Sequence, residues 1–349
     1  MNKKWILPII LVAGLLCFLN AIQGVLLPFV LAFVLAYLMN PSVSWLGKRI
    51  GRSLASGIMI SLLVIFCVLL VFLLIPVLQS QISNFIGRVP LMADNFVGYL
   101  KKMVLWAKPE ISYQQIDRLS EITTQTMISV LKTLGVGLNQ IVSGGLAIVN
   151  VLALLFISPI ISFYLLKDLP KMKKKCQEAL PNPYREKIQS FFKELDKTLS
   201  GFLRGRACVC LLLALYYSVA LSILGLDLGA VIGLTTGILS FIPYVGFLIG
   251  LIICVILAVV QTMGWSLVLW VLAVFIVGNI LEGYILTPNL VGRRCGLHPV
   301  WILFALLAGG ALFGFLGVLV AVPMAAVIGV VIRHLYAFYK NTRFYQGEK

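Results

Sequence analysis

Acidic residues and histidine are scarce in this sequence. Only 12 of its 349 residues are Asp or Glu, and only His298 and His334 are histidines. Charged residues make up 11% of the chain and hydrophobic residues 61%, with a mean hydropathy of +1.05. A soluble fold of this length cannot hide so much apolar surface, so the composition indicates an integral membrane protein.

The motifs of common catalytic classes are also missing. The chain has no HExxH zinc motif, no GKS or GKT phosphate loop and no GxSxG elbow. The sequence therefore predicts that the protein is not an enzyme and needs no cofactor and no metal ion. Its seven cysteines lie mostly in apolar stretches without a CxxC pair, which favours a packing role. Without a phosphate loop, any transport would be passive or ion-coupled.

Apolar stretches of membrane length occur along the whole chain. About 20 such residues form a helix that crosses roughly 30 Å of hydrocarbon. We therefore predict an all-α fold, a polytopic integral membrane helical bundle of about eight hydrophobic segments. The segments are 5–21, 25–39, 54–76, 146–166, 207–224, 228–260, 265–286 and 300–332.

The 28 Lys and Arg residues lie between these segments and give a net charge of +16. They are not interleaved with aromatic residues that would stack on bases, so nucleic acid is not an expected partner. The positive-inside rule places the most basic stretch, 167–206, in the cytoplasm and 79–145 outside. Both termini are then expected to be cytoplasmic.

This pattern predicts six regions. They are N-terminal transmembrane helices (1–78), extracytoplasmic amphipathic helices (79–145), a transmembrane helix (146–166), a basic cytoplasmic helix (167–206), a C-terminal transmembrane transport core (207–332) and a cytoplasmic tail (333–349). Apolar residues at steps of three and four indicate that the second and fourth regions are amphipathic. The basic helix is interpreted either as a lever or docking helix or as a helix lying on anionic lipid.

Two of the apolar stretches, 228–260 and 300–332, are 33 residues long and exceed the length of one crossing. If each enters and returns on the same side, Arg293, Arg294 and the basic C-terminus are all cytoplasmic, as the positive-inside rule requires. We therefore expect two re-entrant hairpins. Long, tilted single crossings are the alternative.

Small residues recur four positions apart in the late segments. Such spacing lets helix backbones approach closely in lipid, where packing drives association. The predicted packing residues are Gly225, Gly229, Gly233 and Gly237, a further step from Gly246 to Gly250, and Gly317, Ala321, Ala325 and Gly329.

The stretch 240–250 reads SFIPYVGFLIG and places Pro243 in the middle of an apolar segment. Proline has no amide hydrogen and clashes inside a continuing helix. The carbonyls that it frees are tolerated in a membrane only when they are buried in protein or line a wet cavity. A break of this kind is typical of a midplane transport site, with a simple kink as the alternative.

Glu282 lies in the segment 265–286, three positions after Asn279, so both side chains share one helix face. A carboxylate at membrane depth is costly unless it faces a cavity or a partner, which favours a proton or cation site. Because Glu282 lies near the predicted end of its segment, contact with interfacial water is the alternative.

Several motifs follow one another in a specific order. They are LAYLMNP (35–41), YLLKD (164–168) followed by LP, FLRG (202–205), PYVGxxxG (243–250), ExxxLTPxxxG (282–292), GLHP (296–299) and FGFLGVLVAVP (313–323). Together they resemble the autoinducer-2 exporter family of permeases, over nearly the whole chain. Two positions depart from the family pattern, Phe247 and Arg206, and Phe247 is expected to alter the width of a cavity.

The resemblance implies a homo-oligomeric, multi-pass transporter of the inner membrane, in contact with the lipid bilayer. It implies secondary export of a small solute such as autoinducer-2, or Na+/H+ antiport. The expected pathway residues are Glu282, Asn279, Pro243, Tyr244, Gly246, Phe247, Gly250, Pro288 and Gly292, with a cytoplasmic gate or lever at Asp168, Arg204 and Gly205. The alternative function is a non-transporting membrane scaffold that recruits partners through its amphipathic helices.

Overall fold

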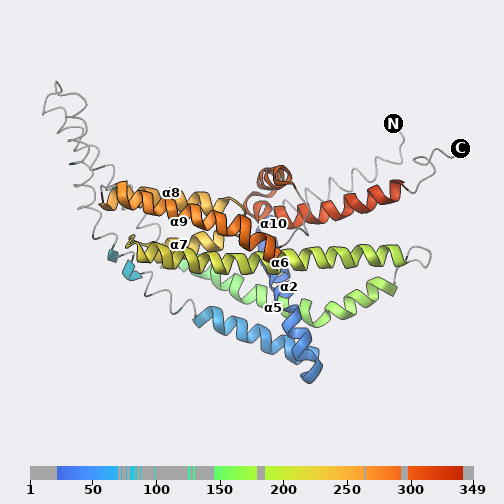
Figure 1. Ribbon diagram of the computed structural model, residues 1–349. Coiled ribbons are helices and arrows are strands. Elements are labelled where there is room, and N and C mark those ends of the chain that lie inside the picture. The colour runs from blue at the N-terminus through green and yellow to red at the C-terminus, as the bar shows by residue number, and fades with distance from the viewer. Residues whose placement is uncertain are drawn as a thin grey trace. The chain divides into compact units, whose positions relative to one another are not determined.

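The computed structural model describes residues 22–69, 145–178, 185–262, 265–291 and 298–340, with isolated positions between 72 and 129. All regular elements in these ranges are helices (Figure 1). Six of them are long and apolar enough to cross a membrane, which confirms the predicted polytopic helical fold. The predicted segment 5–21, nearly all of 79–145 and the end of the tail lie outside the described residues.

The helices form two compact units. The first comprises residues 1–64, 153–207 and 287–349, and the second comprises 65–152 and 208–286. The elements in chain order are α2 (Gln23–Ile50), a helix over Arg52–Leu69, α5 (Gly145–Glu178), α6 (Arg185–Ile223), α7 (Gly229–Leu239), α8 (Val245–Thr262), α9 (Trp265–Ile280), the π-helix η3 (Leu281–Val291) and α10 (Pro299–Lys340).

Several helices continue beyond the apolar segments that predicted them. Helix α2 runs through Pro41 to Ile50, and α5 continues past Leu166 to Glu178. Helix α6 passes from the basic stretch into the apolar one without interruption. Apolar composition marks where a helix meets lipid, but helical hydrogen bonds continue in water until a residue ends them. Gly51 does so for α2, with a φ of 86°.

One arginine fixes the turn at Gly51 in the first unit. Arg52 Nε donates to the carbonyl oxygen of Leu166 at 2.8 Å, and its Nη2 donates to Asn40 Oδ1 at 2.7 Å. These bonds join the start of the second helix to both α2 and α5. Beside them lies a small buried core made of Ala36, Val43, Ala55, Ile60 and Leu166.

The stretch 228–260 folds back on itself. Helices α7 and α8 pack against each other, and the C-terminal half of α6 lies along α7 (Figure 1). At the base, Gln261 Nε2 donates to the carbonyl oxygen of Gly225 at 2.8 Å, and the Asp227 N–H donates to Gln261 Oε1 at 2.9 Å. The stretch therefore ends where it begins and forms a hairpin, whereas its re-entry into the membrane stays a prediction. With 11 residues, α7 is only about 16 Å long, too short to cross a bilayer.

The helix over 300–332 is also interrupted, although both of its arms belong to the single element α10. Phe313 and Gly314 leave the helical conformation, and Gly314 has a φ of 56°. On either side of this turn the backbones of Gly309 and Gly317 lie close together, and a Cβ atom on Gly309 would lie 2.6 Å from the Gly317 carbonyl oxygen. The chain therefore reverses at Phe313 and Gly314.

Glycines form the seam between α6 and α7. A Cβ atom on Gly229 would lie 2.8 Å from the Leu221 carbonyl oxygen, and Cβ atoms on Gly233 and Gly237 would overlap the backbone of α6. Gly225 is not part of this seam, since it follows α6 with a φ of 69° and a Cβ atom built on it would meet nothing within 4 Å in the described part of the chain. The seam lets two helices approach until their backbones touch, as small residues do in lipid.

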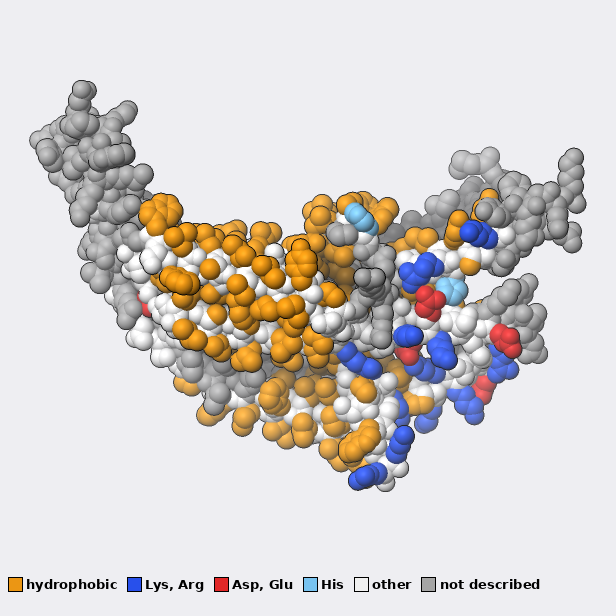
Figure 2. Space-filling view, viewed as in Figure 1, with side chains coloured by type: hydrophobic (Ala, Val, Ile, Leu, Met, Phe, Trp, Pro, Cys, Tyr) orange, Lys and Arg blue, Asp and Glu red, His pale blue; other side chains and the backbone are white. Residues whose placement is uncertain are grey.

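The surface of the second unit is apolar. Ile252, Leu269 and Trp270 expose 56%, 62% and 60% of their surface, and hydrophobic side chains cover α8 and α9 in Figure 2. In the first unit, charged side chains gather at the end of α5, the start of α6 and the end of α10 (Figure 2). This distribution is that of helices that pass from lipid into water.

Gly237→Ala is expected to destabilise the protein by about 1 to 3 kcal/mol, because the added methyl group meets the backbone of Ala214. Thermal unfolding in detergent measures the loss. The matched control is Gly283→Ala, where the added carbon meets no described residue within 4 Å apart from its own chain neighbours and helix backbone. Equal melting temperatures for the two variants would show that the α6–α7 seam is looser than described.

Single cysteines at Asp227 and Thr262 are expected to react with a membrane-impermeant thiol reagent from the same side of the membrane. The reason is that Gln261 holds the two ends of the hairpin together. Labelling of intact and permeabilised cells measures the side, in a background without the native cysteines. Labelling from opposite sides would contradict the hairpin.

Candidate functional site

The tip of the α7–α8 hairpin satisfies its own backbone. The N–H groups of Ser240, Phe241 and Ile242 donate to carbonyl oxygens of α7 at 2.9 to 3.0 Å. The next residue, Pro243, has no N–H group and needs no partner. Tyr244, with a φ of 69°, turns the chain and its carbonyl accepts the first bond of α8, from the Leu248 N–H at 3.0 Å. At this position of the turn, proline therefore leaves no backbone N–H group without a hydrogen-bond partner.

Two glycines of α8 hold the tip against α7. A Cβ atom on Gly246 would lie 2.6 Å from the Thr236 carbonyl oxygen, and one on Gly250 would overlap the Thr236 hydroxyl. Gly246, Gly250 and Thr236 are all buried. The predicted pathway residues Gly246 and Gly250 therefore lie together, at the place where the two arms meet.

Aromatic side chains fill the core of the second unit. The rings of Tyr217 from α6 and Phe275 from α9 stack with centroids 4.8 Å apart. Phe247 of α8 meets Phe275 edge to face at 5.9 Å. Phe247, which was singled out in the sequence as a departure from the family pattern, therefore contacts the aromatic core directly behind the hairpin tip.

Tyr217 is fully buried, with 1% of its surface exposed, and its hydroxyl has no hydrogen-bond partner among the described residues. The hydroxyl lies against Gly278 of α9, where any larger residue would overlap it. Thr236 has the same burial, and its hydroxyl likewise lacks a hydrogen-bond partner in the described part of the chain. Two unpaired hydroxyls in an apolar core are costly, which marks them as candidates for a role beyond packing.

Glu282 lies in the first turn of η3 and is partly buried. The candidate membrane span Trp265–Val291 continues well past the predicted end at Leu286, so Glu282 lies inside it. Its carboxylate lies near the side chain of Tyr217. A π-helix is rare and frequently occurs at functional sites, and here it begins one residue before the carboxylate.

The remaining predicted pathway residues are more dispersed. Asn279 and Pro288 are exposed, on α9 and η3 respectively, and Gly292 lies outside the described residues. No cluster of three metal-binding side chains occurs in the described ranges. The structure therefore places the hairpin tip, the aromatic core and Glu282 in one unit, whereas Pro288 belongs to the other.

The predicted gate residues lie in the first unit. Arg204 Nε donates to the Tyr37 carbonyl oxygen at 3.1 Å, which joins α6 to α2. Gly205 is buried and packs so tightly against Leu290 that a side chain in its place would overlap the Leu290 backbone. Asp168 faces its own helix neighbour Lys171 at 3.9 Å. Two of the three predicted residues thus join helices, and the third forms a surface ion pair.

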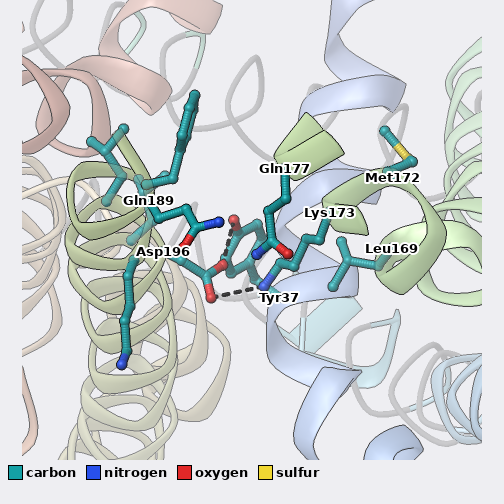
Figure 3. Close-up of a pocket in the computed structure, with 11 residues that line it drawn as sticks. Tyr37, Leu169, Met172, Lys173, Gln177, Gln189 and Asp196 are labelled. Carbon is teal, nitrogen blue, oxygen red and sulfur yellow. Dashed lines mark hydrogen bonds and ion pairs between the residues drawn. The ribbon is translucent and has the colours of Figure 1, made fainter. Parts of the chain in front are cut away.

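Sequence reasoning missed Tyr217 and Thr236. Each is a polar residue within an apolar segment, and that is the signal that singled out Glu282. It also missed the pair formed by Tyr37 Oη and Asp196 Oδ1 at 3.1 Å, drawn in Figure 3. These residues are 159 positions apart, and no local pattern connects them.

Membrane-length helices without a catalytic motif define a polytopic helical membrane protein. The sequence profile of a family described as AI-2E family transporter matches residues 6–337. The chain belongs to this family, which confirms the resemblance read from its motifs. At the level of the family it is a membrane transport protein and not an enzyme.

Named relatives cover most of the chain. YrrI of Bacillus subtilis, whose name describes it as a transport protein, is 29% identical over 91% of this chain and 88% of its own length. PerM of Escherichia coli, named as a permease, is 27% identical over 93% of this chain and 91% of its own. The AI-2 transport protein TqsA of Escherichia coli is 23% identical over 91% and 88%.

Tyr217→Phe is expected to leave the stability unchanged or raise it by about 1 kcal/mol, because it removes a buried hydroxyl that has no hydrogen bond. The neighbouring Tyr216→Phe is the matched control. Tyr216 Oη donates to the Val274 carbonyl oxygen at 2.9 Å, so this variant is expected to lose about 0.5 to 1.5 kcal/mol. Thermal unfolding of both variants measures the difference in stability. A greater loss of stability in Tyr217→Phe than in Tyr216→Phe would show that the Tyr217 hydroxyl does have a hydrogen-bond partner.

Proposed function

We propose that this protein is a secondary transporter whose pathway passes through the second unit, along the α7–α8 hairpin and Glu282. The observation that carries the proposal is the position of Glu282, in a π-helix within a membrane span. A carboxylate at that depth is expensive to maintain without a cavity or partner, so it is a natural proton or cation site.

The hairpin supports the same pathway. Broken helices near the membrane midplane offer backbone groups to a solute in many transporters. Here the tip, at Pro243 and Tyr244, packs on α7 through Gly246 and Gly250 and touches the aromatic core through Phe247. A short α7 with joined ends supports re-entry from one side of the membrane. Asn279, Pro288 and Gly292 remain predicted members of the pathway.

The relatives suggest the class of cargo. TqsA is named for transport of autoinducer-2, and PerM is named as a permease. The proposed activity is export of a small polar solute of that kind, or cation/proton antiport. The sequence has no phosphate-binding loop, so the energy comes from an ion or solute gradient.

Contacts of the C-terminal arm support the proposed orientation. Arg333 Nη2 and His334 Nε2 of α10 lie 3.0 and 3.6 Å from the carboxylate oxygens of Glu194 on α6. The end of α10 therefore lies beside the basic stretch that the positive-inside rule assigns to the cytoplasm. This arrangement supports a cytoplasmic C-terminus, whereas assembly into a homo-oligomer stays a prediction.

Glu282→Gln is expected to abolish gradient-driven flux while the protein stays folded, since the amide cannot carry or release a proton. Purified protein in vesicles is given an imposed proton or sodium gradient, and ion and solute movement are recorded. Glu178→Gln, the same change on an exposed carboxylate paired with Lys174 at the end of α5, is the control and should transport normally.

Unchanged flux in Glu282→Gln would remove this residue from the mechanism. The scaffold alternative predicts a different result. In that case neither the unaltered protein nor any variant shows flux, and deletion of 171–197 abolishes the cellular phenotype.

A further inference from the structure

A cavity of about 650 Å³ lies between α2, α5 and α6 in the first unit (Figure 3). Its volume is within the range of sites that hold a small molecule or the polar end of a larger one. The lining residues are Tyr37, Leu169, Met172, Lys173, Gln177, Gln189, Phe192, Lys193, Leu195, Asp196 and Leu199. None of them belongs to the pathway proposed for transport.

Polar groups converge at the centre of this cavity. Asp196 accepts hydrogen bonds from Tyr37 Oη at 3.1 Å and from Lys173 Nζ at 2.9 Å, so its charge is already compensated. The ammonium group of Lys173 retains two further N–H donors. The amides of Gln177 and Gln189 extend toward the centre of the cavity from α5 and α6 (Figure 3). The ammonium group and the amide N–H groups can therefore donate to a ligand bound there.

The rest of the lining is apolar with a basic rim. Leucine, methionine and phenylalanine side chains form the walls, and Lys193 is exposed at the rim. No ion-pair partner of Lys193 is present among the described residues. With two lysines and one aspartate, the lining carries a net charge of +1. Such a site suits an anion that continues into an apolar chain.

The position along the helices points to the membrane surface. The cavity residues of α5 start just after its apolar stretch ends at Leu166, and those of α6 end shortly before its apolar stretch begins at 207. Helices that leave the hydrocarbon meet lipid headgroups at this level. Basic pockets between helices on the cytoplasmic side are well suited to anionic headgroups.

We propose that this cavity binds an anionic phospholipid of the cytoplasmic leaflet. The phosphate diester, with one negative charge, accepts from Lys173 and from the two glutamine amides, with Lys193 at the rim. An acyl chain lies against Leu169 and Met172 of α5 and Phe192 of α6. This site is separate from the proposed pathway and does not depend on transport activity.

The test uses the purified full chain in detergent with phosphatidylglycerol and phosphatidylcholine as probes. Native mass spectrometry is expected to show one retained phosphatidylglycerol per chain, and thermal unfolding is expected to show a larger rise in Tm with phosphatidylglycerol than with phosphatidylcholine. Lys193→Gln is expected to weaken phosphatidylglycerol binding about fivefold, as for one lysine near an anionic surface. Lys173→Gln is expected to weaken it at least as much.

Two further variants separate the cavity from the general charge of the surface. Lys197→Gln removes the same charge from an exposed position on the same helix, outside the cavity, and is expected to bind as the unaltered protein does. Leu169→Trp fills the cavity without changing the charge and is expected to abolish retention of the lipid.

Three results would overturn the proposal. Equal losses in Lys193→Gln and Lys197→Gln would indicate general attraction to the basic surface. The same rise in Tm with glycerol 3-phosphate alone would indicate a soluble phosphate ester as the ligand. Equal retention of phosphatidylcholine and phosphatidylglycerol would show that the cavity does not select an anion.

Discussion

Hydrocarbon has no group that can accept or donate a hydrogen bond, and this constraint shapes the turn between α7 and α8. At the α7–α8 tip, three amides donate back into α7 and the fourth position is Pro243, which has none to donate. At the base of the hairpin, one side chain, Gln261, pairs with both a carbonyl and an N–H. The N–H groups at the tip of the hairpin are therefore satisfied without water.

Glycine residues at the helix contacts allow the helices of the second unit to pack closely. In lipid there is no hydrophobic gain from bringing helices together, so close packing of their backbones has to stabilise the association. Gly233 and Gly237 allow this between α7 and α6, and Gly278 makes the room that the Tyr217 hydroxyl occupies against α9. The unpaired hydroxyl of Tyr217 is thus placed by the packing of small residues.

Much of this could be predicted from the sequence, for reasons that are local. The length of 228–260 and the charges of Arg293 and Arg294 indicated a hairpin, Pro243 indicated a break in the helix, and hydropathy with one acidic residue indicated Glu282. The Gln261 bonds, the Tyr37–Asp196 pair and the Arg52 bonds to α5 could not be predicted, because their partners are 34 to 159 positions apart. The π-helix was missed too, since its hydrogen-bond shift has no distinct periodicity in eleven residues.

The hydrogen bonds of Gln261 also bear on how the helices of the second unit are connected. Helices α6 and α9 touch each other directly, through Tyr216 and Val274 and through Tyr217 and Phe275. Because Gly225 and Gln261 meet at the base, the chain leaves the end of α6 and returns just before α9 at nearly the same point. In architectural terms, the hairpin is an excursion between two helices that already contact each other.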